Sequence, residues 1–302
     1  MDRALVIGEA LVDVVARADG SVSEHAGGSP ANVAVGLARL GRATVLATEL
    51  GDDGFGELVA GHLAESGVEL SEHSVQPGHT TCSARAVLDD AGAATYTFDV
   101  RWRPDLTDIA GDFLVLHTGS MAAAIEPGAS GVRSLLRDRR THSTISYDVN
   151  ARPALMGAAD AARARVKEFA ALSDVVKASD EDLAWLEPAM TWQEAAASVL
   201  SLGPAAVVVT RGSEGAAVVA VEGVVTATAP SVDVVDTVGA GDSFNAALLD
   251  ALWSRDLLGG HRRAELAGFP LDGWRDIASQ AARLAALSTT RAGAQPVYRH
   301  EV

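Results

Sequence analysis

The chain has 302 residues, of which 48% are hydrophobic, and a formal net charge of −16 from 40 acidic residues against 24 Lys and Arg. This much apolar material can bury a large core, so a disordered or fibrous chain is excluded. The acidic balance would repel a nucleic-acid backbone, which makes nucleic acid a poor candidate partner, although backbone N–H groups could still capture a small anion locally.

The cysteine content and the N-terminus indicate a location. Cys82 is the only cysteine in the sequence, so no disulfide can form within the chain, which favours a reducing compartment. The apolar N-terminal stretch carries Glu9 and Asp13, and a signal peptide or a membrane span would avoid such charges. We therefore expect a cytoplasmic protein with no membrane partner.

Six short apolar runs predict buried strands, and helical patterns lie between them. The runs cover residues 4–8, 44–50, 113–117, 144–148, 174–179 and 205–210. The clearest helix is "SPANVAVGLARLG", in which Ser29 can cap, Pro30 suits the first helical position and Gly41 can close the helix. The alternation predicts an α/β fold, a doubly wound, mainly parallel sheet flanked by helices.

Two segments, residues 9–25 and 80–102, break this alternation because they lack crossover helices. The second contains two β-rich runs on either side of "DDAGA", which is typical of a hairpin. We expect the two segments to form a small antiparallel sheet, a lid inserted into one domain that spans residues 1–302. A further hairpin is predicted at 215–229, after the sixth strand.

The stretch "DTVGAGDSFNAAL", residues 236–248, follows a strand-like run at 232–235 and opens a helix. Its glycines let backbone N–H groups turn toward one point at the positive end of that helix, which favours an anion hole. An aspartate beside such a hole can accept the proton of an alcohol that attacks phosphorus. The alternative is an ordinary acidic helix start. The predicted catalytic residues are Gly239, Ala240, Gly241 and Asp242.

Other phosphate-binding loops are excluded by the sequence. Lys167 and Lys177 are the only lysines and neither follows a glycine, so no Walker loop is present. The first strand leads into "GEALVD", which lacks the three spaced glycines of a dinucleotide fingerprint.

A second set of residues suits a ligand rich in hydroxyl groups. The pair Gly27 and Gly28 precedes the first predicted helix and allows a ligand to approach the backbone, while Asn32 offers both a donor and an acceptor. Asp13 follows the first strand and could accept hydrogen bonds from two adjacent hydroxyls. Each residue alone could be structural, but together they indicate a pocket at the carboxyl ends of the strands.

These motifs together resemble the signatures of the ribokinase/PfkB-type carbohydrate kinases, with a pattern most similar to fructokinases, over essentially the whole chain. The motifs are "GEALVD", "GGSPANVAVGLARLG", "GDDGFG" and "DTVGAGDSFNAAL". The resemblance implies a ribokinase-like fold with a β-lid over the sugar, ATP as donor with Mg²⁺, and Asp242 as base. It also implies that Asp13, Gly28 and Asn32 hold sugar hydroxyls.

The resemblance further implies where the nucleotide and a monovalent cation bind. "TRGSEG" at 210–215 and the helix at 274–288 would flank the nucleotide. The expected nucleotide residues are Ser179, Thr210, Gly212, Gly215 and Thr237. Carbonyl groups of two stretches would hold the cation, which we expect to be K⁺, and the residues concerned are Asp236, Val238, Ser288, Arg291 and Gly293.

One stretch departs from the family pattern. The Asn-x-x-Glu that usually follows the fifth strand is replaced by "KASDEDL", so Ser179 and Asp182 occupy its two key positions. Asp182 is the candidate for Mg²⁺, unless Glu181 substitutes through a register change. An acidic helix start is the competing interpretation.

The acceptor is suggested by two further stretches. "DVNARP", with Asn150 and Arg152, resembles fructokinases and ketodeoxygluconate kinases, and on the lid Arg101 or Trp102 could reach the sugar. Alternatively, Trp102 packs the hinge and Arg101 is solvated. We expect transfer of the γ-phosphoryl group of ATP to a primary hydroxyl, foremost that of fructose. 2-Dehydro-3-deoxygluconate, ribose and nucleosides are alternative acceptors.

Two expectations concern the protein as a whole. A non-catalytic sugar-binding regulator is the alternative from a different class, but the intact "GAGD" argues against it, because such a protein has no need of the base. Exposed lid edges often find a partner strand, so a homodimer through the lid is plausible.

Overall fold

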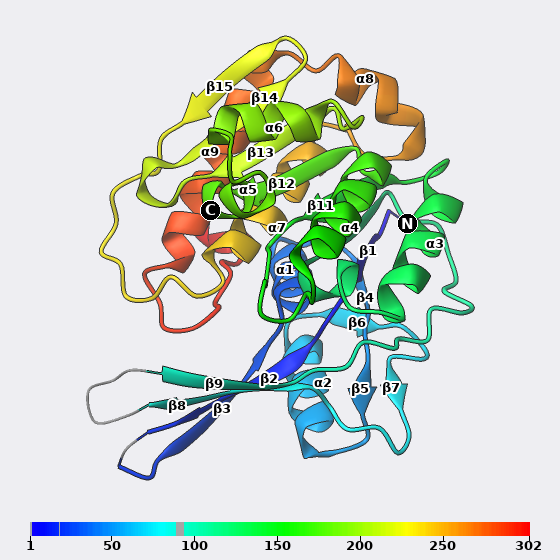
Figure 1. The fold of residues 1–302 in the computed structure, drawn as a ribbon, viewed down its shortest axis with the longest axis vertical. Coiled ribbons are helices and arrows are strands. Elements are labelled where there is room, and N and C mark those ends of the chain that lie inside the picture. Colours follow the sequence, from blue (N-terminus) through cyan, green and yellow to red (C-terminus); the bar gives the residue numbers. More distant parts are fainter. Residues whose placement is uncertain (1, 18, 89–93) are drawn as a thin grey trace.

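A nine-stranded sheet forms the centre of the computed structural model, which describes residues 2–17, 19–88 and 94–302 (Figure 1). Its strand order is β15-β14-β13-β12-β11-β10-β1-β4-β6. Pairing is parallel from β6 to β13, and β14 and β15 add an antiparallel hairpin. The strands are β1 Ala4–Ile7, β4 Thr44–Ala47, β6 Val68–Leu70, β10 Val115–Gly119, β11 Thr144–Asp148, β12 Val175–Ser179, β13 Ala206–Thr210, β14 Ala216–Ala220 and β15 Gly223–Ala227. Each of the six predicted strands and the hairpin is therefore present.

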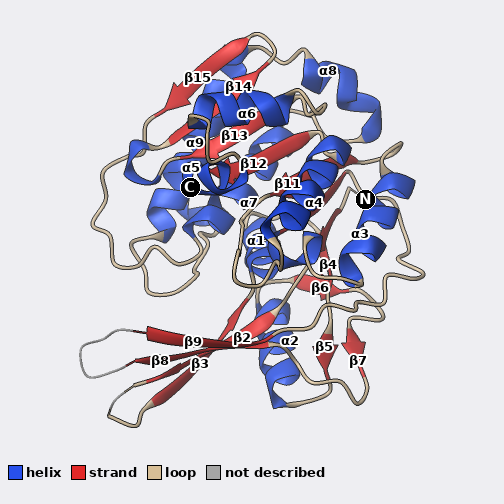
Figure 2. Cartoon of the chain, viewed as in Figure 1, coloured by secondary structure: helices blue, strands red, loops and turns tan. Residues whose placement is uncertain are grey.

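Helices cover both faces of this sheet (Figure 2). Neighbouring residues of β1 show the division, because Val6 lies in one buried cluster and Leu5 in the other, as the pleat requires. The first cluster includes residues of α1 Ser29–Arg39, α2 Gly54–Glu65, α7 Ala240–Ser254, α8 Arg263–Ala267 and α9 Leu271–Ser288. The second includes residues of α3 Gly128–Arg139, α4 Ala159–Leu172, α5 Asp180–Leu186 and α6 Trp192–Leu200. The doubly wound α/β fold is thus confirmed.

A small four-stranded sheet extends away from the core, at the lower left of Figure 1. Its order is β3-β2-β8-β9, from β2 Leu11–Ala16, β3 Val22–Gly27, β8 Ser83–Leu88 and β9 Ala94–Asp99. The prediction that this sheet is antiparallel is wrong for its central pair, because β2 and β8 run parallel. The chain passes through the core between them, so they do not form a hairpin. The turn expected at "DDAGA" lies outside the described residues.

Short elements complete the described chain. Strands β5 Leu50–Gly51 and β7 Val75–Gln76 pair with each other, and the 3₁₀ helices are η1 Ser120–Ala123, η2 Gly212–Glu214, η3 Gly260–Arg262 and η4 Arg299–Glu301. Within the described residues, no helix combines the length and the apolar character needed to cross a bilayer.

The strand predicted at 232–235 does not form. These residues belong to a loop in which Val234 and Val235 are 60% and 65% exposed. The Val235 N–H donates to the carbonyl of Thr289 rather than to a sheet, so the loop runs beside the segment that follows α9. β-Branched residues favour a strand only where a neighbouring strand edge is available to pair with them.

Candidate active site

Asp242 lies in the first turn of α7, and its carboxylate is held by two side chains of α1. The Ser29 hydroxyl donates to Oδ1 at 2.6 Å and the Asn32 amide donates to Oδ2 at 2.8 Å. The two helices approach closely because Gly36 has no side chain, and a Cβ there would lie 2.5 Å from the Cβ of Ala246. The predicted cap at Ser29 is wrong, since its hydroxyl bonds Asp242 instead of the backbone of α1.

The environment of Asp242 sets its proton affinity. Burial raises the pKa of this carboxyl group, and hydrogen bonds from Ser29 and Asn32 and the charges of Lys177 and Arg152 oppose the rise. A buried carboxylate whose charged form is stabilised by hydrogen bonds can serve as a base for a hydroxyl proton. The geometry therefore suits the predicted role of Asp242.

The loop before Asp242 has the conformation expected of an anion hole. Gly239 adopts a φ of +73°, and a Cβ there would lie 2.6 Å from the side chain of Ala294, so both its backbone and its surroundings require glycine. The Ala240 N–H donates to the carbonyl of Thr237 at 3.2 Å, which occupies one of the three predicted donors within the turn. Among the described residues, the N–H groups of Gly239 and Gly241 have no such acceptor and stand at the positive end of α7.

The predicted acceptor residues gather near the carboxyl end of β1. Asp13 lies on β2 opposite β3, and its Oδ2 would be only 2.2 Å from a Cβ at Gly27. Gly28 has a φ of +104°, and a Cβ there would lie 2.4 Å from the carbonyl oxygen of Glu9. Burial raises the pKa of Asp13, while the charge of His25 opposes it. The glycine pair is thus required by contacts within the chain, and the approach of a ligand to it stays a prediction.

The loop after β11 brings its two predicted residues together. Arg152 Nη1 donates to Oδ1 of Asn150 at 2.7 Å, and Asn150 has a φ of +32°. Burial raises the pKa of both Glu9 and Asp242, and the charge of Arg152 is a small influence that opposes each rise. A contact between Arg152 and a sugar stays a prediction.

The two predicted lid contacts, Arg101 and Trp102, differ in their exposure to solvent. Trp102 is 2% exposed, its indole N–H donates to the carbonyl of Ala122 at 3.1 Å, and a Cβ at Gly128 would touch its ring. The prediction that Trp102 reaches a sugar is therefore wrong, and its side chain is packed inside the protein, as in the alternative that placed it at the hinge. Arg101 is exposed and its guanidinium donates to the Thr80 hydroxyl.

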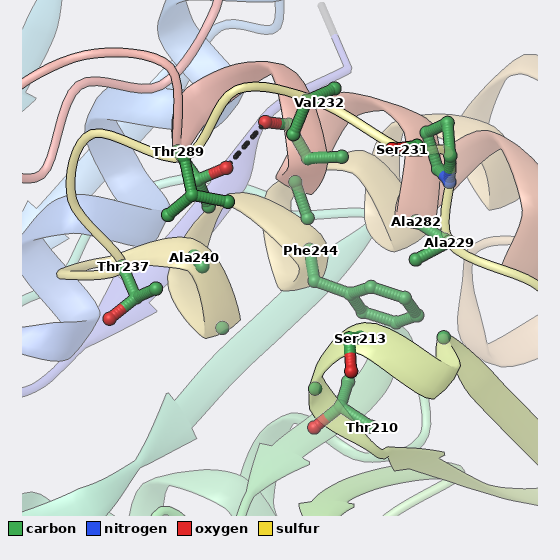
Figure 3. Close-up of a pocket in the computed structure, with 17 residues that line it drawn as sticks. Thr210, Ser213, Ala229, Ser231, Val232, Thr237, Ala240, Phe244, Ala282 and Thr289 are labelled. Carbon is green, nitrogen blue, oxygen red and sulfur yellow. Dashed lines mark hydrogen bonds between the residues drawn. The ribbon is translucent and has the colours of Figure 1, made fainter.

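A cavity of about 540 Å³ lies between η2 and α9 and reaches Ala240 and Gly241 (Figure 3). Four of the five predicted nucleotide residues line it, namely Thr210, Gly212, Gly215 and Thr237. Ala282, Ala285 and Ala286 supply small side chains from α9, and Phe244 extends toward Ser213. The apolar walls suit a flat aromatic base, and the cavity leads to the N-terminus of α7.

Ser179 and Asp182 are occupied with each other. Ser179 caps α5 by accepting from the Asp182 N–H at 3.0 Å, and the Asp182 carboxylate accepts from the N–H groups of Ser179 and Ala151, both at 2.8 Å. Ser179 does not line the nucleotide cavity. The acidic helix start that we named as the alternative describes this arrangement, and neither residue is free of backbone partners.

The residues predicted for a monovalent cation bring two loops together. Asp236 accepts from Val238 N–H at 3.0 Å and from Gly293 N–H at 2.8 Å, which lowers its pKa. The Arg291 side chain pairs with Glu301, and the Ser288 hydroxyl donates to the carbonyl of Ala285. The side chains of Arg291 and Ser288 therefore have partners within the chain, and a cation held by carbonyl oxygens of these loops stays a prediction.

Sequence reasoning missed a buried charged group, Lys177, beside Gly241 in the first turn of α7. Lys177 lies in β12 and pairs with Asp148 at 3.1 Å, and Asn245 of α7 donates to the same Asp148 oxygen at 2.7 Å. The signal was available, because a lysine inside the apolar run "DVVKAS" cannot be buried without a partner. The partner lies 29 residues earlier in another motif.

Comparison with known proteins identifies the family of the chain and agrees with its fold. Residues 1–300 match the family model described as "pfkB family carbohydrate kinase". A fructokinase from Rhizobium leguminosarum bv. trifolii is 36% identical over 266 residues, covering 84% of this chain and 81% of that protein. A Vibrio cholerae O395 fructokinase double mutant bound to fructose, ADP and potassium superposes with a TM-score of 0.80 at 28% identity, over 97% and 94% of the two chains. A Salmonella enterica aminoimidazole riboside kinase, complexed with that riboside and an ATP analogue, gives 0.79 at 27% identity, over 97% and 95%. The chain belongs to the pfkB family of carbohydrate kinases.

Proposed function

We propose that this kinase transfers the γ-phosphoryl group of ATP to a primary hydroxyl of fructose, with Asp242 as the general base. The observation that carries the proposal is the position of Asp242. Its carboxylate is fixed by Ser29 and Asn32 beside the acceptor residues, and it lies one residue beyond Gly241, which lines the nucleotide cavity.

The chemistry follows from this arrangement. The sugar hydroxyl loses its proton to Asp242 as its oxygen forms a bond to the γ-phosphorus, and the bond between that phosphorus and the bridging oxygen breaks. ADP leaves with the electron pair, while the N–H groups of Gly239 and Gly241 face the charge on the transferred group. Asp13, Asn150 and Arg152 would orient the hydroxyls.

Mg²⁺ and K⁺ belong to the same proposal. No cluster of three or more His, Cys, Asp or Glu side chains suited to a metal occurs in the described part of the chain. Mg²⁺ would be held mainly by the phosphates of ATP, as is usual for this ion, with Asp182 as the candidate protein ligand. It would neutralise phosphate charge. K⁺ would lie at the carbonyls of Asp236, Val238, Ser288, Arg291 and Gly293.

The test of the acceptor is ADP release over a panel of fructose, 2-dehydro-3-deoxygluconate, ribose, glucose, adenosine, inosine and aminoimidazole riboside. The panel is run with and without K⁺, and again after Mg²⁺ is chelated. We expect the highest kcat/KM with fructose. A nucleoside that surpasses every sugar would overturn the assignment, and sugar binding without turnover would favour the regulator.

The base is tested by Asp242→Asn, which should lower kcat by about 10² to 10⁴ while ATP affinity stays near that of the wild type. Asp272→Asn is the matched control, because Asp272 also begins a helix but pairs with Arg275 at the surface. Unchanged turnover in Asp242→Asn would remove Asp242 as the base.

We also propose that the small sheet is a lid over the sugar and that the protein is cytoplasmic. We further propose that two copies of the chain pair through this sheet. Val22 and Val87 lie opposite the same residue, Ala16, so they share one face of the sheet, and they are 54% and 47% exposed. An apolar row on an exposed sheet favours a partner surface. Sedimentation of Val22→Ser/Val87→Ser should show a smaller particle than the wild type, and an unchanged mass would contradict the dimer.

A further inference from the structure

A buried lysine stands directly beneath the loop that faces the phosphoryl group. Lys177 lies in the interior of β12, and only 6% of its side chain is exposed. Its ammonium group has three N–H donors, but within the described residues its one hydrogen-bond acceptor is Asp148 Oδ2, at 3.1 Å. Two donors are therefore available for another group.

The ammonium group of Lys177 lies against Gly241. A Cβ placed on Gly241 would lie 3.1 Å from Nζ of Lys177, so the ammonium touches the first turn of α7 at the residue that also lines the nucleotide cavity. A cation at the N-terminus of a 15-residue helix is opposed by the helix dipole. Such a position becomes favourable when an anion occupies the same end.

The surrounding charges keep this ammonium protonated. Burial works to lower the pKa of Lys177, but the carboxylates of Asp148, Asp182 and Asp242 outweigh it, and the pKa is raised. Asp148 is itself anchored to α7 by the Asn245 amide, so the lysine is held against the helix from below. The chain thus keeps a full positive charge, partly unpaired, at the site where negative charge develops.

We propose that Lys177 is a side-chain member of the anion hole, donating an N–H to the phosphoryl group as it moves from ATP to the sugar. This role rests on the proposed kinase reaction at Asp242. No bond to Lys177 forms or breaks; its charge stabilises the oxygens of the transferred group in the transition state, where that charge is most spread.

The test compares Lys177→Met with Lys167→Met. Lys167 is the only other lysine of the chain, and it forms a surface pair with Glu187. We expect Lys177→Met to lower kcat by about 10² to 10³, the usual effect of losing one donor of such a hole, while the KM for the sugar changes little. Lys167→Met should keep wild-type kcat. Equal kcat in the two variants would overturn the proposal.

The double variant Asp148→Asn/Lys177→Met distinguishes a purely structural role of Lys177 from the proposed action on the phosphoryl group. It removes both charges of the buried pair. If Lys177 only neutralises Asp148, the double variant regains both the thermal stability and the kcat lost in Lys177→Met, and the proposal fails. If Lys177 acts on the phosphoryl group, the double variant regains stability and kcat stays low.

A binding measurement keeps the inference independent of the acceptor. Titration calorimetry with ADP and Mg²⁺, in the presence and absence of aluminium fluoride as the transition-state mimic, needs no identified sugar. Lys177→Met should retain the affinity for ADP within about threefold and lose most of the gain in affinity that fluoride produces in the wild type. An undiminished gain would overturn the role of Lys177. Absence of wild-type turnover with every acceptor would instead overturn the proposed function.

Discussion

The hydroxyl of Ser29 on α1 donates a 2.6 Å hydrogen bond to Oδ1 of Asp242 on α7, 213 positions later in the chain. This contact joins α1, which begins at the predicted acceptor residues, to α7, which begins at the predicted anion hole. Burial alone would raise the pKa of Asp242 and keep its carboxyl protonated over a wider pH range, and the Ser29 hydroxyl acts against this. In the proposed reaction, the Ser29 hydroxyl therefore favours the charged form of the base.

Ser29→Ala should move the acid limb of the pH profile of kcat/KM to higher pH by on the order of one unit, because a hydrogen bond to the charged form is lost. At pH values below that limb the rate should fall several-fold, and on the alkaline plateau it should change little. The measurement is the rate of ADP release from pH 5 to 9. Ser29→Thr, which keeps the hydroxyl, is the control, and an unmoved limb in Ser29→Ala would show that the hydroxyl does not tune the base.

Local patterns predicted the core of the fold well. Each of the six apolar runs is a strand of the central sheet, and Pro30 and Gly41 mark the start and the end of α1. These features depend on a few neighbouring residues. Gly41, for example, has a φ of +79°, a conformation that favours glycine directly after a helix. The backbone turn at Gly239 could be predicted for the same reason.

The predictions that proved wrong concern residues whose structure is set by contacts with distant parts of the sequence. Serine is a residue type that commonly caps helices, yet the Ser29 hydroxyl donates its hydrogen bond to a carboxylate 213 positions away. Residues 232–235 have strand composition, but they find no strand to pair with. The parallel pairing of β2 with β8 depends on the chain passing through the core between them, which no local pattern records. The surroundings of Lys177 were hidden for the same reason, since the neighbouring carboxylates lie on β11 and at the starts of α5 and α7.

Gly28→Ala should cost more stability than Gly41→Ala, although both residues have a positive φ. A Cβ at Gly41 meets nothing within 4 Å, so that variant pays only backbone strain, about 1 to 2 kcal/mol. At Gly28 the added Cβ would also lie 2.4 Å from the backbone carbonyl oxygen of Glu9, which cannot move as a flexible side chain could. Urea unfolding measures the difference, and the sugar KM should rise in Gly28→Ala alone. Equal losses of stability would show that the loop relaxes without cost.

Trp102→Phe should lower the melting temperature while leaving the sugar KM within about twofold of the wild-type value. The substitution removes the indole N–H that donates to Ala122 and leaves that buried carbonyl short of a partner, at a cost of about 1 to 3 kcal/mol. Arg101→Ala is the companion variant, because Arg101 is exposed on the same stretch and could still reach a sugar. A large rise of KM in Trp102→Phe would restore Trp102 as a substrate contact.

Glu9→Gln should flatten the dependence of stability on pH between about 5 and 8. Glu9 is 3% exposed, and burial raises its pKa to about 7, against partial compensation by hydrogen bonds such as that from the Ala122 N–H and by the charge of Arg152. Its second oxygen, Oε1, is buried without a hydrogen-bond partner among the described residues. Because the folded protein holds this proton more tightly than the unfolded chain, whose pKa is 4.5, the native state is favoured most below that value.

As the pH rises from 4.5 through 7, the wild type must ionise Glu9 inside the core, so the free energy of unfolding should fall by about 3 kcal/mol from this group alone. Glutamine has no proton to lose, and in Glu9→Gln this part of the fall should be absent, whereas the contributions of Asp13, Asp148 and Asp242 remain in both proteins. Urea unfolding at half-unit steps of pH measures the difference between the two curves. Glu222→Gln, at an exposed position between β14 and β15, is the surface control. If Glu9→Gln instead runs parallel to the wild type, Glu9 is already ionised in the folded protein and its oxygen has found a partner.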